Sequence, residues 1–84
     1  MKVSVAYVES RQQFWQEFDI QEGATALDAI ERSGVLARHP HLDLARNKVG
    51  IYGRFVPLTA RLTEGDRVEI YRPVTATDDD DDDD

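Results

Sequence analysis

The sequence contains no cysteine among its 84 residues. This absence excludes disulfide bonds, a thiolate nucleophile, cysteine-held zinc and iron–sulfur clusters. The chemistry of this protein must therefore come from other side chains, or from surfaces that bind a partner.

An excess of positive charge is also lacking. Ten Lys and Arg stand against seventeen Asp and Glu, and seven of these acids form the run Asp78–Asp84. The rest of the chain is therefore neutral, without the clustered positive charge that binds phosphates. We expect no binding to nucleic acid or to an anionic membrane surface.

Long apolar runs are missing as well. The N-terminal MKVSVAYVES alternates briefly and then becomes charged, whereas a membrane-spanning helix needs about 20 apolar residues. We therefore expect a cytoplasmic monomer with one folded domain at residues 1–74, followed by a disordered acidic tail at 75–84.

Alternating apolar residues predict the strands. Two such runs, 1–8 and 12–20, are joined by the polar link ESRQ and indicate an antiparallel hairpin. Alternation resumes in KVGIYG and RFVPL, and RVEIYR forms the last strand after the turn TEGD. Pro57 cannot donate to a ladder, so its run belongs at a sheet edge or strand end.

One segment, EGATALDAIERSG, has helical rather than alternating periodicity. Thr25 is placed to cap the N-terminus, Asp28 adds negative charge to the first turn, and Gly34 suits a left-handed C-cap. The next stretch, VLARHPHLDLARN, has no steady period, and we interpret it as a loop that buries its leucines.

This order of elements predicts an α+β fold with the ubiquitin-like β-grasp topology. We expect a mixed sheet of four to five strands with one main helix packed on one face. A ferredoxin-like fold would need two helices of comparable length, and only one is visible in the sequence.

Two segments, HPHLDLARNKVGIYGR and LTEGDRVEIYRP, resemble the RnfH family of small bacterial proteins. The family pattern has SG after the helix, then P-x-[IL]-D-L, NKVGI[FY]G and GDRVEIYRP. The opening VAY and the helix EGATALDAI also agree, so the resemblance covers most of residues 1–73. One difference is the end of the chain, where TATDDDDDDD replaces the usual Asp-Pro-Lys element and basic residues.

The resemblance implies a ubiquitin-like, non-enzymatic module that binds other proteins. Members are associated with Rnf electron-transport clusters or are labelled as the RatB half of a RatA–RatB toxin–antitoxin pair. It therefore implies a protein partner, either an Rnf component or a RatA-like protein, and no catalytic residue.

A diverged sulfur carrier is the alternative, because carriers of molybdopterin and thiamine synthesis share the β-grasp topology. Their chemistry needs a terminal Gly-Gly that threads a narrow channel in the activating enzyme. The last glycine of this sequence is Gly65, which disfavours that role.

Candidate catalytic or metal-binding groups are sparse. His39, His41 and Asp43 could meet one ion, but we interpret them as loop side chains placed by Pro40, with Asp43 accepting hydrogen bonds in a turn. Glu64 and Asp66 flank a turn glycine and are better explained by solvation. We expect no enzyme activity, no cofactor and no metal.

Outward-pointing aromatic side chains give the candidate contact surface. Trp15, Tyr52 and Tyr71 are predicted on the face that the helix does not cover, and Trp and Tyr are enriched at interface centres. Arg72, at the exit of the last strand, is placed to hold a carboxylate of the partner. The alternatives are that the long loop covers part of this face, or that the face is simply solvated.

The seven C-terminal aspartates repel one another and bury nothing. We interpret them as a solubilising tail. Two functional alternatives are a salt-sensitive contact to a basic surface and weak binding of divalent cations.

Overall fold

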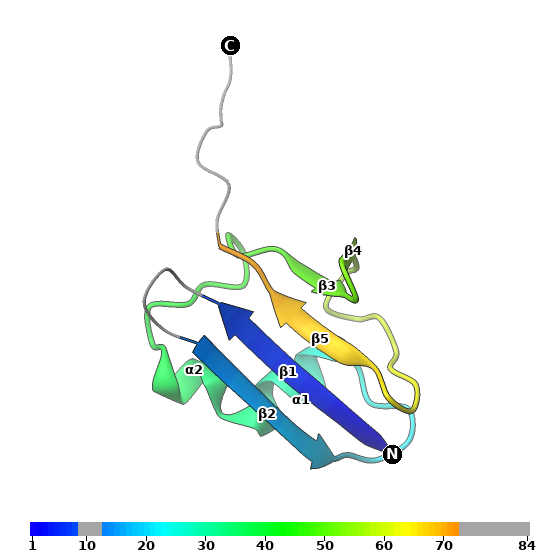
Figure 1. The fold of residues 1–84 in the computed structure, drawn as a ribbon. Coiled ribbons are helices and arrows are strands. Elements are labelled where there is room, and N and C mark those ends of the chain that lie inside the picture. The colour runs from blue at the N-terminus through cyan, green and yellow to red at the C-terminus, as the bar shows by residue number, and fades with distance from the viewer. Residues whose placement is uncertain (9–12, 73–84) are drawn as a thin grey trace.

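The computed structural model describes residues 1–8 and 13–72. The link predicted at 9–12 and the predicted acidic tail lie outside these residues. Seven elements follow one another along the chain (Figure 1): β1 (Lys2–Val8), β2 (Gln13–Asp19), α1 (Ala26–Ser33), α2 (Val35–Arg38), β3 (Val49–Ile51), β4 (Arg54–Phe55) and β5 (Arg67–Ile70).

The strands form one mixed five-stranded sheet in the order β2-β1-β5-β3-β4. β1 and β5 are parallel neighbours at its centre, whereas the other pairs are antiparallel. The predicted mixed sheet and the α+β class are confirmed. Pro57 lies two residues beyond β4, at a sheet margin, as its missing N–H requires.

A two-residue turn joins β3 to β4. Tyr52 and Gly53 have φ values of 50° and 84°, and two consecutive positive φ angles are the mark of a type I′ hairpin turn. Gly53 adopts this conformation freely, while Tyr52 occupies a region that bulky residues rarely enter. The turn fixes the register in which Gly50 lies opposite Phe55.

The predicted capping of α1 is confirmed. The Thr25 hydroxyl accepts from the Asp28 N–H at 3.2 Å, and the Asp28 carboxylate accepts from the Thr25 N–H at 3.0 Å. This reciprocal capping box satisfies two backbone donors that the first helical turn leaves without partners. Gly34 ends the helix in the left-handed conformation, with φ at 82°.

The loop predicted after Gly34 is wrong at its start, where the single-turn helix α2 forms and buries Val35 completely. Four residues are too few to show helical periodicity, so the sequence pattern gave no signal for it. None of the helices in the part of the chain described here is both long and apolar enough to cross a membrane.

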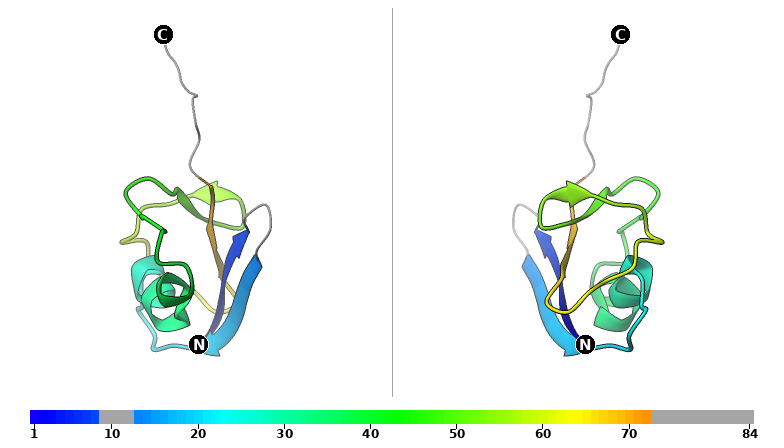
Figure 2. Two further views of the ribbon diagram at one scale, coloured as in Figure 1. Left: turned by 90° about the vertical axis from the view of Figure 1, so that its left-hand side faces the viewer. Right: turned by 90° about the vertical axis from the view of Figure 1, so that its right-hand side faces the viewer.

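Both helices lie on one side of the sheet (Figure 2), and the buried side chains pack between these two layers. Val3, Val5 and Tyr7 of β1 point into this core, as alternation predicts. The other core side chains come from β2, α1, α2, β3, β5 and the connecting segments: Phe14, Ile20, Ala24, Ala26, Ala29, Ile30, Val35, Val49, Leu62, Val68 and Ile70. Since α1 and α2 share one face, no helix of the described residues covers the opposite face of the sheet.

Replacing Thr25 with alanine should lower the free energy of unfolding by about 1 kcal/mol, because the Asp28 N–H loses its acceptor. Urea denaturation measures the loss. Thr59→Ala is the matched control, since Thr59 is exposed outside any helix. Equal stability of the two variants would contradict a capping role.

Candidate protein-contact surface

The sheet face opposite the helices, called the open face here, has one row of residues that crosses all five strands. Trp15 pairs with Ala6, Ala6 with Glu69, Glu69 with Gly50, and Gly50 with Phe55. Paired residues in neighbouring strands project to the same side of a sheet. The four side chains of this row, and the bare Cα of Gly50, therefore share the open face.

The two ends of the row are exposed aromatic side chains. Trp15 on β2 is 58% exposed and Phe55 on β4 is 69% exposed. Four strand spacings separate them, or about 19 Å. Of the residues between them, Ala6 and Gly50 are small, and Glu69 has the one long side chain.

Tyr71, just beyond β5, lies over Gly50. Its ring meets that of Phe55 edge-on, with the centroids 5.5 Å apart. A Cβ atom added at Gly50 would lie 2.7 Å from the Tyr71 hydroxyl and 2.7 Å from the Arg54 carbonyl oxygen. Only glycine leaves room for the tyrosine here, and the tyrosine in turn holds one side of Phe55.

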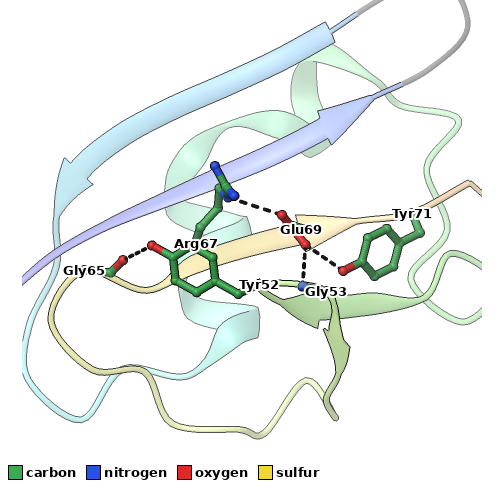
Figure 3. A network of polar contacts seen from close by, with 6 residues as sticks. All are labelled: Tyr52, Gly53, Gly65, Arg67, Glu69 and Tyr71. Carbon is green, nitrogen blue, oxygen red and sulfur yellow. Dashed lines mark hydrogen bonds and ion pairs between the residues drawn. The ribbon is translucent and has the colours of Figure 1, made fainter.

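Glu69 is the polar centre of the open face (Figure 3). Its Oε1 accepts from the Tyr71 hydroxyl at 2.7 Å and from the Gly53 N–H at 2.8 Å, and its Oε2 lies 3.2 Å from Arg67 Nε. Hydrogen bonds to an ionised acceptor are stronger than neutral ones. One carboxylate therefore ties the β3–β4 turn to the last strand.

Arg67 continues this network toward Tyr52. Its guanidinium carbon lies 5.0 Å from the centroid of the Tyr52 ring, within the range of a cation–π contact. The Tyr52 hydroxyl donates to the Gly65 carbonyl oxygen at 2.7 Å. Tyr52 is thus fixed at both its backbone and its hydroxyl, although the residue remains 58% exposed.

The predicted contact residues do not all lie together. The structure places Trp15 and Tyr71 on the open face, and Tyr52 beside it in the β3–β4 turn. Arg72 is exposed directly after Tyr71. Trp15 stands apart from the tyrosines, since β1 separates its strand from β5.

Phe55 and the carboxylate of Glu69 were missed as site residues. A signal for Phe55 was present in the sequence, because a two-residue Tyr52-Gly53 turn places residue 55 opposite Gly50. No pattern in the sequence indicates that Glu69, rather than solvent, satisfies both the Tyr71 hydroxyl and the Gly53 N–H.

The histidines lie away from the open face. His39 is buried and meets the rings of Tyr7 and Phe14 edge-on, with centroids 5.1 and 6.2 Å apart. His41 Nε2 lies 3.4 Å from the Tyr7 hydroxyl. Within residues 1–8 and 13–72, no three His, Asp or Glu side chains group as metal ligands would.

The acidic side chains of the loops have structural partners. Asp43 accepts from the Ala45 N–H at 2.9 Å, which confirms its predicted role in a turn. Glu64 and Asp66, which we had attributed to solvation, accept from the backbone N–H groups of Lys2 and Thr63 at 3.1 and 2.8 Å. These carboxylates hold the chain entering β5.

Burial and the hydrogen bond to Glu69 raise the pKa of Tyr71 from 10 to about 12. Below pH 10 the phenol is protonated in both the folded and the unfolded chain, so its stabilising contribution is complete. Between about pH 10 and 12 the unfolded chain loses the proton first, and that contribution disappears.

The free energy of unfolding of the wild-type protein should therefore fall more steeply over this pH range than that of Tyr71→Phe. The difference in slope is at most about 1.4 kcal/mol per pH unit for one proton. Urea denaturation of both proteins between pH 9 and 12 measures it. Parallel curves would show that Tyr71 ionises as easily in the folded protein as in the unfolded chain.

Comparison with known proteins gives the same family over most of the chain. The model of the RnfH family of ubiquitin-like proteins matches residues 1–82. A protein named RnfH from Cereibacter sphaeroides is 57% identical over 74 residues, which are 88% of this chain and 87% of the relative. A protein of the same name from Rhodobacter capsulatus is 51% identical, again over 88% of this chain and 87% of the relative.

Solved structures agree on the fold. Small archaeal modifier protein 1 of Haloferax volcanii superposes with a TM-score of 0.65 at 18% identity, over 87% of this chain and 98% of its own. A Pyrococcus furiosus protein named as molybdopterin converting factor subunit 1 gives 0.63 at 24% identity, over the same shares. The predicted ubiquitin-like β-grasp fold and the resemblance are both confirmed: the chain belongs to the RnfH family of ubiquitin-like proteins.

Proposed function

We propose that this protein is a non-enzymatic, cytoplasmic module that binds a protein partner through its open face. The observation that carries the proposal is the pair of exposed aromatic side chains, Trp15 and Phe55, at the two ends of one cross-strand row. A partner surface that covers both ends would bury the whole width of the sheet.

The aromatic groups are suited to this role because most of them are already held in place. Phe55 rests against Tyr71, and Tyr52 is fixed by its hydrogen bond to Gly65. Aromatic side chains contribute large contact areas. Side chains ordered before binding lose less entropy when a partner covers them.

The arginines near Glu69 indicate which kind of partner surface would fit the open face. Arg67 keeps 43% of its side-chain surface exposed beside Glu69, and Arg72 is exposed at the end of β5. Carboxylates of a partner would meet these guanidiniums, with apolar side chains against Trp15 and Phe55. An apolar surface with a few central acids therefore fits this face.

The family suggests which proteins to test. Its name and its members' associations indicate an Rnf electron-transport component or a RatA-like protein as the partner. Sulfur carriage is not part of the proposal, because likeness to a molybdopterin converting factor at 24% identity shows the fold alone.

Trp15→Ala and Phe55→Ala should each weaken binding to the purified RatA-like protein or to an Rnf subunit of the same host. The expected loss is about 2 kcal/mol, or about thirtyfold in Kd, because each removes an aromatic anchor. Isothermal titration calorimetry on the full chain provides the measurement.

Glu31→Ala is the control for this experiment, since Glu31 is exposed on α1, on the other side of the sheet. It should bind like the wild-type protein. Failure of the wild-type protein to bind either candidate would refute the named partners. Unchanged binding of both aromatic variants would refute the open face as the binding site.

A further inference from the structure

The outer edge of β2 is a second surface, separate from the open face. Within the described residues, β2 is a terminal strand of the sheet, seven residues long, and pairs with β1 alone (Figures 1 and 2). The other terminal strand, β4, has two residues. A long terminal strand presents a row of backbone groups to which another chain can pair.

The hydrogen-bond register between β1 and β2 shows which backbone groups of β2 point away from the sheet. Met1 and Ile20 exchange both backbone bonds, at 2.9 and 3.0 Å, and are therefore a hydrogen-bonded pair. Such pairs alternate along an antiparallel ladder. The residues of β2 that bond to β1 are then the even-numbered ones, and the N–H and C=O groups of Gln13, Trp15, Glu17 and Asp19 point outward.

In the described part of the chain, these outward N–H and C=O groups of β2 have almost no hydrogen-bond partners. Among the described residues, one side chain is directed at them: Gln16 Nε2, which lies 3.5 Å from the Glu17 carbonyl oxygen at the limit of a hydrogen bond. Strand addition would replace this long contact with regular backbone bonds.

Two arginines stand beside this edge on its helix-facing side. The guanidinium of Arg32, from α1, lies 5.9 Å from the ring centroid of Phe18, and that of Arg38, from α2, lies 5.9 Å from that of Phe14. Within residues 1–8 and 13–72, neither arginine has a carboxylate at ion-pair distance. The edge thus carries two available cations above apolar rings.

The positions of Arg32 and Arg38 define how far apart two acidic side chains of an added strand should be. Phe14 and Phe18 are four residues apart in one strand, which corresponds to about 13 Å. Side chains four residues apart in an added strand lie on the same side of the sheet and are separated by the same distance. Two acids with this spacing would meet Arg38 and Arg32 together.

The side chains of β2 on the open face indicate which residues would suit the alternate positions of an added strand. Trp15 and Glu17 face the open side of β2, so apolar or basic side chains of an added strand would suit them. A second copy of β2 fits poorly, because its helix-facing residues are Phe14, Gln16 and Phe18. Such a junction would bring four guanidiniums together without an acid.

We propose that the free edge of β2 binds an extended segment of another protein as an added strand, with two carboxylates four residues apart held by Arg32 and Arg38. Backbone bonds to residues such as Trp15 and Glu17 would supply affinity, and the arginines would supply selectivity. This site is independent of the open face.

The probe is the synthetic peptide TVEVTKEVT, whose glutamates have this spacing, added at millimolar concentration to the ¹⁵N-labelled full chain. We expect saturable shifts and slowed solvent exchange at the Trp15 and Glu17 amides. The glutamine peptide TVQVTKQVT should bind about fivefold to tenfold more weakly, because it lacks both carboxylates.

The double variant R32Q/R38Q should bind both peptides equally weakly, while R46Q/R54Q, with the same loss of charge on exposed residues remote from β2, should behave like the wild-type protein. Unchanged spectra, equal binding of the two peptides by the wild-type protein, or shifts centred on Phe55 and Tyr71 would overturn the proposal. Self-association of the protein through β2 without peptide would overturn it as well.

Discussion

The parallel pairing of β1 with β5 is the contact on which the rest of the structure depends. It brings the first and last strands together at the centre of the sheet, with Val5 beside Val68, and neither side chain retains exposed surface. Both valines face α1, which has a single apolar stripe to bury. In the described part of the chain, both helices therefore lie on one side of the sheet, and the other side becomes available for contacts.

The same pairing organises the open face. It sets Glu69 beside Ala6, in the middle of the row from Trp15 to Phe55. From this position the Glu69 carboxylate reaches both the Tyr71 hydroxyl and the Gly53 N–H. A half-buried carboxylate with several donors is costly to displace, so the β3–β4 turn and its aromatic neighbours are held in one arrangement before any partner arrives.

Much of the fold follows from the sequence, because alternation and capping are local signals. Thr25, Asp28 and Gly34 mark α1 without reference to any other element, and the alternation of β1 and β5 identifies the side of the sheet that each residue faces. The open face could be predicted from the sequence only in part. Trp15 and Tyr71 were placed by strand phase alone, but the network at Glu69 depends on strand order and on a turn with two positive φ angles. No local pattern encodes contacts between segments so distant in the chain.

The structure offers two kinds of surface for the proposed contacts: a preorganised aromatic face and a strand edge flanked by cations. We propose that a protein partner binds the open face. Photo-crosslinking in the native host tests this most directly, with benzoylphenylalanine placed in turn at positions 15, 55 and 31. Positions 15 and 55 should form an adduct with the same protein, and position 31, on α1, should form none. Adducts from position 31 alone would contradict binding through the open face.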